Sequence, residues 1–184
     1  MKTSDTLSIL CPFTNVKAQQ AGDSIILSRI RKWIIAFMIL LILSGITAFP
    51  VQTELHFLLH HQNFIPDFFI PWLRIIGDAI DDTASKYPYL LYGYDWLAYS
   101  HIIIALFFIG VYLNPIQNAW VLRIGMIACC GIFILAAVCG QIRGIPFFWT
   151  LIDCSFGVFG MIPLLIVQKQ INRLEDFHVD YKMI

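Results

Sequence analysis

Residues 140–160 read GQIRGIPFFWTLIDCSFGVFG and join two apolar segments through a short polar turn. Arg143 lies in the turn, and Asp153 lies several residues inside the second apolar segment. An ionisable side chain at that depth in a membrane costs roughly 2.5–3.5 kcal/mol on insertion scales. The fold has to compensate for this cost, so we expect Asp153 to face a neighbouring helix and not lipid.

The composition of the whole chain makes a membrane its expected solvent. Of the 184 residues, 59% are apolar and only 13% are charged, whereas soluble domains are about 45–50% apolar and about 25% charged. Twelve basic and twelve acidic residues give a net charge of zero, and there is no polybasic tract. This balance argues against nucleic-acid binding.

Four apolar segments have about the length that is needed to cross a hydrocarbon layer of about 30 Å. The expected spans are residues 33–49, 96–113, 120–140 and 146–167. The connections between the last three spans are short, so consecutive spans should be antiparallel neighbours. The sequence therefore predicts an all-α membrane protein with four transmembrane helices in an up-down bundle.

The predicted four-helix transmembrane domain covers residues 24–168. A polar segment, 1–23, precedes it as a flexible cytoplasmic arm, and a charged cytoplasmic tail, 169–184, follows it. Residues 50–94 form a long outer loop that is expected to carry short amphipathic helices lying along the membrane surface or capping the bundle. A cleaved signal peptide is the alternative for the first span, but the segment before it is too long and too polar for the usual n-region.

Basic residues set the expected orientation, because cytoplasmic segments of membrane proteins carry an excess of Lys and Arg. Three basic residues, Arg74, Lys86 and Arg143, lie on the side of the long loop and the polar turn. Nine lie on the opposite side: Lys2, Lys17, Arg29, Arg31, Lys32, Arg123, Lys169, Arg173 and Lys182. Both termini are therefore expected in the cytoplasm, with the long loop outside.

Two ionisable residues within spans are predicted to lie at similar depths below the outer surface. At 1.5 Å per residue, His101 lies roughly 7–8 Å inside the second span and Asp153 roughly 9 Å inside the fourth. Four further polar residues lie just above them: Arg143, Gln141, Asp95 and Glu54. We therefore expect an outward-facing polar pocket.

Helical spacing places Thr150, Asp153, Gly157 and Gly160 on one helix face, and small residues of this kind mark close helix packing in membranes. Tyr94 and His101 share a face of the second span in the same way. The pocket candidates are Asp153, His101, Arg143, Asp95, Gln141, Tyr94 and Thr150. Asp153 has two interpretations: a structural ion pair or hydrogen bond with Arg143 or His101, or a role in binding a ligand or a proton.

The histidine-rich run HFLLHH of the long loop offers candidate metal ligands. His56 and His60 are four residues apart and share a helix face; together with Glu54 they could bind zinc. His101 and one loop histidine could instead ligate haem. Histidines at the mouth of a helix bundle, without any cofactor, are the simpler interpretation, so the sequence leaves the cofactor open.

The stretches YGYDWLAYSH (92–101) and GQIRGIPFFWTLIDCSFGVFG (140–160) resemble those of a group of small, functionally uncharacterised bacterial inner-membrane proteins with four spans. AFPVQTEL (48–55) adds to the resemblance, which extends over residues 33–168. The resemblance implies the bacterial inner membrane as the location. It implies no activity, cofactor or partner.

Three classes of function fit these patterns. The first is a non-enzymatic membrane component, either an accessory or assembly subunit beside a larger membrane-protein partner or a binder of a small lipid-like ligand. The second is a redox subunit that is linked to haem or quinone. The third is a metal-dependent enzyme acting at the outer leaflet, with Glu54, His56 and His60 as ligands. We favour the first, because each candidate set lacks one or two residues of a complete catalytic site.

Overall fold

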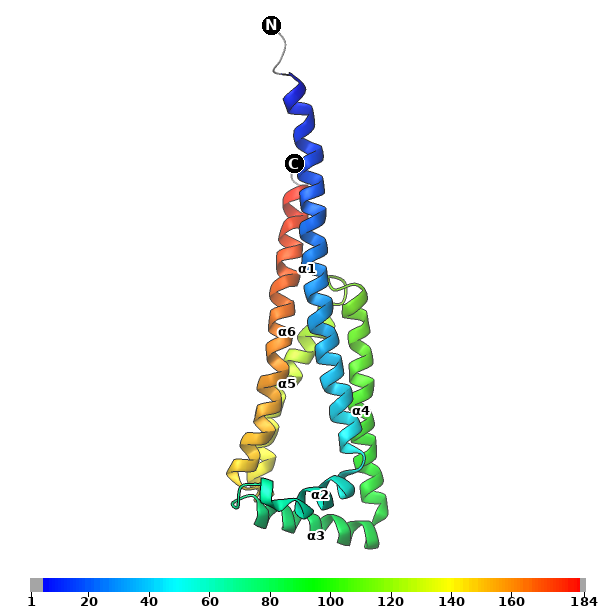
Figure 1. Ribbon diagram of the computed structural model, residues 1–184, viewed down its shortest axis with the longest axis vertical. Coiled ribbons are helices and arrows are strands. Elements are labelled where there is room, and N and C mark those ends of the chain that lie inside the picture. Colours follow the sequence, from blue (N-terminus) through cyan, green and yellow to red (C-terminus); the bar gives the residue numbers. More distant parts are fainter. Residues whose placement is uncertain (1–4, 183–184) are drawn as a thin grey trace. The chain divides into compact units, whose positions relative to one another are not determined.

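The computed structural model describes the backbone of residues 5–182 and the side chains of residues 22–176 (Figure 1). The described residues form helices and contain no strand, which confirms the all-α class. The helices are α1 (Asp5–Ala48), α2 (Val51–His60), the 3₁₀ turn η1 (Gln62–Phe64), α3 (Ile70–Lys86), α4 (Pro88–Leu113), α5 (Ala119–Ile142) and α6 (Phe147–Lys182).

Three helical segments are long and apolar enough to cross a membrane. They are Pro88–Leu113, Ala119–Ile142 and Phe147–Asp176. A fourth span is counted if the pair Gly22–Ala48 and Val51–His60, which is bent by 81°, crosses as one broken helix. These helices indicate an integral membrane protein. The up-down order of a four-helix bundle stays a prediction.

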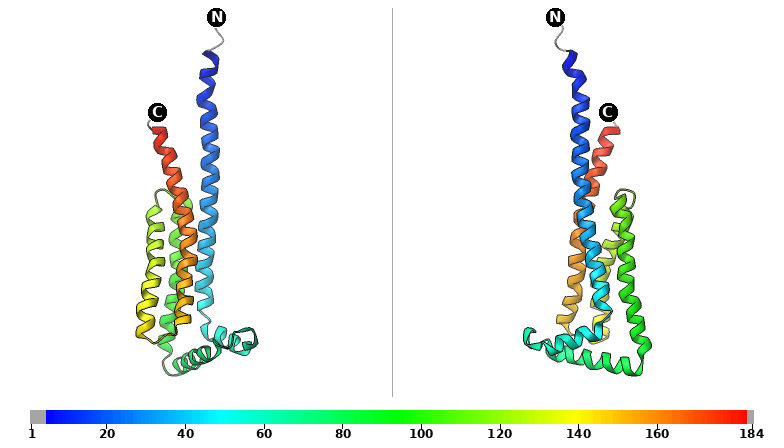
Figure 2. Two further views of the ribbon diagram at one scale, coloured as in Figure 1. Left: turned by 90° about the vertical axis from the view of Figure 1, so that its left-hand side faces the viewer. Right: turned by 45° about the vertical axis from the view of Figure 1, so that its right-hand side comes forward.

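Helix α1 is continuous from Asp5 to Ala48 (Figure 2). It therefore includes most of the 1–23 segment, for which we expect a flexible arm. Helical backbone geometry does not measure motion, so the flexibility of this segment stays a prediction. Helices α2 and α3 fall in the predicted outer loop, and whether they lie along a membrane surface also stays a prediction.

The chain forms two compact units, and α1 and α4 each contribute to both. The first unit contains the described residues up to Phe37 and from Phe108, and the second contains residues 38–107. In the first unit, a stripe on α6 is almost completely buried: Leu164, Val167, Ile171 and Leu174. These residues are three and four positions apart and so share one helix face.

Helices α5 and α6 lie side by side in the first unit (Figures 1 and 2). Glycines allow the close approach: a Cβ built on Gly157 would lie 3.0 Å from the backbone oxygen of Cys129, and one on Gly160 would lie 3.1 Å from the Cys129 sulfur. Gly157 and Gly160 therefore act as a close-packing device, as the sequence predicts.

The turn between α5 and α6 depends on Gly144, whose φ of 66° lies in the left-handed region that favours glycine. The Gly144 backbone amide donates to the backbone oxygen of Gln141 at 3.2 Å, and the Ile145 amide donates to the backbone oxygen of Gly140 at 2.9 Å. This pair of bonds is a Schellman motif, which satisfies carbonyls at the end of α5. It closes the turn that contains Arg143.

In the second unit, the last turns of α1 pack on α4 through Gly45. A Cβ built on Gly45 would lie only 2.7 Å from the Ala98 oxygen and 3.2 Å from the His101 Cβ. Ala98 and Ala105 of α4 are buried as well. Small residues on both helices therefore let the two backbones approach each other.

The bend that follows α1 comes from Pro50, which has no amide hydrogen and disfavours helical geometry in the residue before it. The Glu54 amide then donates to the Pro50 oxygen at 2.9 Å, which begins α2. Helix α2 packs on α3, with Leu55 and Leu73 buried between them. Gly77 of α3 lies against Leu59 and Leu55.

We predict that Gly45→Ala lowers the thermal stability of the purified protein in detergent. The added methyl group would overlap the Ala98 carbonyl, and overpacking of this kind costs about 1–3 kcal/mol. Gly93→Ala in α4 is the matched control, because a Cβ at Gly93 meets nothing within 4 Å. Equal melting temperatures for the two variants would contradict the close contact.

Candidate functional site

The candidate site residues are divided between the two units. The first unit holds Gln141, Arg143, Thr150 and Asp153, and the second holds Glu54, His56, His60, Tyr94, Asp95 and His101. The predicted meeting of His101 with Asp153 needs residues of both units. It therefore stays a prediction.

The second unit has a half-open pocket of about 200 Å³ at the bend between α1 and α2. We call it the bend pocket. It brings together two candidate residues that the sequence analysis names, Tyr94 and Asp95. The remaining lining residues are Phe49, Pro50, Val51, Gln52, Thr53 and Leu91.

Two helical elements position the lining of the bend pocket. The α1–α2 bend around Pro50 supplies one wall, and α4 supplies the other with Leu91, Tyr94 and Asp95. These α4 residues are three and four positions apart, so they lie on one side of the helix. The Gly45 contact with Ala98 holds α1 close to α4 four residues before Phe49, the first lining residue.

Asp81 of α3 anchors the α2 wall of the pocket. Gln52 donates a hydrogen bond from its Nε2 to Asp81 Oδ1 at 3.1 Å. His56 Nε2 lies 3.0 Å from both carboxylate oxygens of Asp81. These contacts hold the pKa of the Asp81 carboxyl below its usual value of 3.8, with the His56 hydrogen bond as the main cause.

The pairing of His56 with Asp81 was not predicted from the sequence. Gln52 and His56 are four residues apart on α2, which is a signal that both could reach one acceptor. The acceptor itself lies 25 residues beyond His56, on a different helix. Only the packing of α2 on α3 brings them together.

The histidine candidates make local contacts in the structure. His61 Nδ1 lies 3.0 Å from the Phe57 oxygen, and the His60 ring lies edge-on to the His61 ring. His101 Nδ1 lies 3.0 Å from the Leu97 oxygen of its own helix. Glu54 lines a separate, more open hollow of about 430 Å³.

These contacts do not bring the predicted metal ligands Glu54, His56 and His60 together. Within the described part of the chain, no group of three or more His, Cys, Asp or Glu residues could hold a metal ion. His56 contacts Asp81, which also accepts a hydrogen bond from Gln52, and neither Glu54 nor His60 contacts Asp81. A zinc site on Glu54, His56 and His60, or haem on His101, stays a prediction from sequence.

In the first unit, Asp153 lies between two residues of α6 that face α5. A Cβ built on Gly140 of α5 would lie 3.2 Å from the Thr150 hydroxyl, and Gly157 approaches Cys129. Asp153, three residues after Thr150 and four before Gly157, therefore lies on the same side of α6. Among the described residues of its own unit, none forms a hydrogen bond or ion pair with the Asp153 carboxyl, Arg143 included.

We predict that the α2–α3 pair loses stability in acid. Because the folded-state pKa of Asp81 lies below its unfolded value, its pairing stabilises the fold fully above pH 3.8 and is lost as the pH falls through the lowered pKa. A titration of the Asp81 carboxyl carbon by NMR in micelles should give a pKa below 3.8. His56→Ala should move it upward.

His60→Ala is the matched control, because His60 does not contact Asp81. Its Asp81 titration should coincide with that of the unmodified protein. If His56→Ala also left the titration unchanged, the His56–Asp81 pair would not exist in solution.

Comparison with known proteins gave no match: no protein-family model, no curated protein and no solved structure is similar to this chain. The bend pocket and the candidate spans are therefore the features that bear on its function.

Proposed function

We propose that the chain is a multi-pass protein of the bacterial inner membrane, with both termini in the cytoplasm, and that it binds a lipid-like ligand in the bend pocket. In this proposal the protein is a non-enzymatic membrane component. The observation that carries the proposal is the bend pocket, with Tyr94 and Asp95 in its wall, at the beginning of a candidate span.

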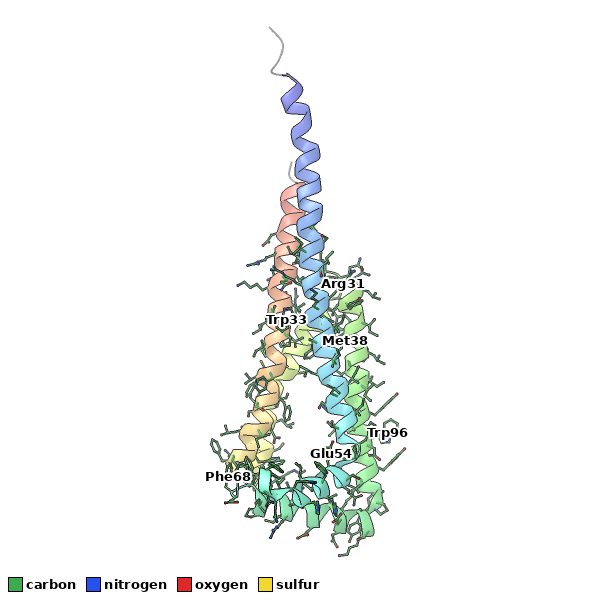
Figure 3. The ribbon with its side chains drawn as sticks, in the orientation of Figure 1. Arg31, Trp33, Met38, Glu54, Phe68 and Trp96 are labelled. Atoms are coloured by element: carbon green, nitrogen blue, oxygen red, sulfur yellow. The ribbon has the colours of Figure 1, made fainter. Side chains whose placement is uncertain are left out.

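The aromatic residues of α4 support a position of the bend pocket at headgroup depth. Tyr and Trp are enriched where membrane meets water, because their rings are apolar and their tips are polar. Tyr92, Tyr94, Trp96 and Tyr99 are all exposed, and Trp96 projects from the outer side of α4 (Figure 3). The strongly apolar part of α4 follows these residues. A ligand in the pocket would therefore contact both water and lipid.

The charges of the second unit support its position outside the cell. Residues 38–107 contain six acidic and two basic residues, which gives a net charge of −4 with neutral histidines. Cytoplasmic segments are instead rich in Lys and Arg. Arg31 is one of the basic residues predicted on the cytoplasmic side; its Nε donates to the backbone oxygen of Tyr112 at 3.4 Å, and its guanidinium lies 5.5 Å from the Tyr112 ring centre.

We predict that the α2–α3 segment and the α5–α6 turn both face outward, and we test this by cysteine labelling in intact cells. In a variant without native cysteines, a membrane-impermeant thiol reagent should label Gln62→Cys and Ile142→Cys before lysis. Gln117→Cys, in the turn between α4 and α5, should react only after lysis. The opposite pattern at all three positions would reverse the proposed orientation.

We predict that phospholipid remains bound to the protein after purification in mild detergent. Leu91→Trp places a bulky ring in the bend pocket and should reduce the lipid-bound fraction several-fold in native mass spectra. Leu90→Trp is the matched control, because Leu90 is exposed on α4 and does not line the pocket. Equal lipid retention in both variants would remove the bend pocket as the binding site.

A further inference from the structure

We propose that the bend pocket recognises the ammonium group of a phospholipid headgroup, with the Asp95 carboxylate as its counter-ion. This inference rests on the proposed lipid-binding function and assigns the chemical class of the ligand. Phosphatidylethanolamine is the membrane lipid with this chemistry that we use as the probe.

The charge of the pocket lining selects a cation. Among the eight lining residues, Asp95 carries the only charge, and none is basic. Glu54 directly follows the lining residue Thr53. Residues 38–107 together carry a net charge of −4. The resulting negative electrostatic potential attracts cationic groups and repels anionic ones. An anionic headgroup such as phosphatidylglycerol would find no counter-ion in the lining.

Asp95 has no partner among the described residues, unlike Asp81 and Asp82 of α3. Asp81 is paired with His56 and Gln52, and Asp82 with Lys86 at 2.6 Å. No hydrogen bond or ion pair to Asp95 is formed by the described side chains. Its carboxylate is partly buried and remains available to a ligand.

The remaining lining groups suit the rest of such a headgroup. Phe49 and Tyr94 supply aromatic rings, which attract ammonium ions through their electron-rich faces. Thr53 and Tyr94 carry hydroxyl donors for phosphate oxygens. The Gln52 side-chain amide has two hydrogens, of which Asp81 accepts one. The pocket therefore offers an acceptor for the ammonium group and donors for the phosphate.

The size of the bend pocket fits a headgroup and excludes acyl chains. A volume of about 200 Å³ corresponds to the space of about seven waters in the liquid. Ethanolamine fills this space in part, whereas acyl chains need far more. They would lie outside, along exposed apolar side chains of α4 such as Leu97 and Ile104, which are 58% and 45% exposed.

The test is lipid competition on the full-length protein in detergent. The protein is offered equal amounts of phosphatidylethanolamine and phosphatidylglycerol, and bound lipid is counted by native mass spectrometry. We expect about a tenfold preference for phosphatidylethanolamine, as hydrogen bonds to a charged group can give. Asp95→Asn should abolish the preference, and Asp95→Glu should retain it.

Asp78→Asn is the matched control, because it removes the same charge from an exposed position of α3 outside the pocket. It should leave the preference unchanged. If Asp95→Asn and Asp78→Asn lost the preference for phosphatidylethanolamine equally, the preference would come from overall charge alone. That result would overturn the role of Asp95. Unchanged melting temperatures would exclude misfolding as the cause.

The outcomes separate this inference from the proposed function. Equal retention of both lipids would keep lipid binding and overturn ammonium recognition. Retention of neither lipid would overturn both. Displacement of phosphatidylethanolamine by millimolar free ethanolamine would support recognition of the ammonium group, and the absence of any displacement would count against it.

Discussion

The close approach of α1 and α4 at Gly45 is the constraint on which the second unit depends. Lipid tails are as apolar as the side chains they touch, so apolar burial does not drive helices together within a membrane. Close packing of the two backbones has to hold the helices together. This packing requires glycine at position 45, because any side chain there would collide with the Ala98 carbonyl. The last turn of α1, and with it the Pro50 bend, is thereby placed against α4. The first unit uses the same principle where Gly157 and Gly160 meet Cys129.

Apolar length was sufficient to predict three candidate spans, whereas the predicted first span, 33–49, counts only if the bent pair Gly22–Ala48 and Val51–His60 crosses as one broken helix. The predicted span 120–140 lies within Ala119–Ile142, and 146–167 coincides with the apolar part of α6. The start of α4 was harder to predict. The helix begins at Pro88, whereas the predicted span begins at residue 96, because a hydropathy argument finds only the part of a helix that lies in lipid. The tyrosines before Trp96 continue the same helix.

The candidate site was predicted less completely, because it depends on contacts between distant segments. Tyr94 and Asp95 were identified from their place at the membrane surface, and the structure brings both into the bend pocket. The opposite wall, from Phe49 to Thr53, was not foreseen as part of a site, because nothing in a linear sequence gives the direction of a bend. Asp81 was missed because it meets His56 only when α3 packs on α2. A meeting of His101 and Asp153 requires the relative position of two units, which no periodicity determines.

The 81° bend at Pro50 also bears on the membrane itself. If α1 crosses the bilayer along its normal, α2 runs nearly parallel to the bilayer plane, and α3 packs on it. Two short helices at this level occupy area in one leaflet and none in the other. Such asymmetric insertion is sensitive to the curvature of the membrane. The protein would then prefer regions where that leaflet is loosely packed, and its distribution within the membrane would follow membrane shape.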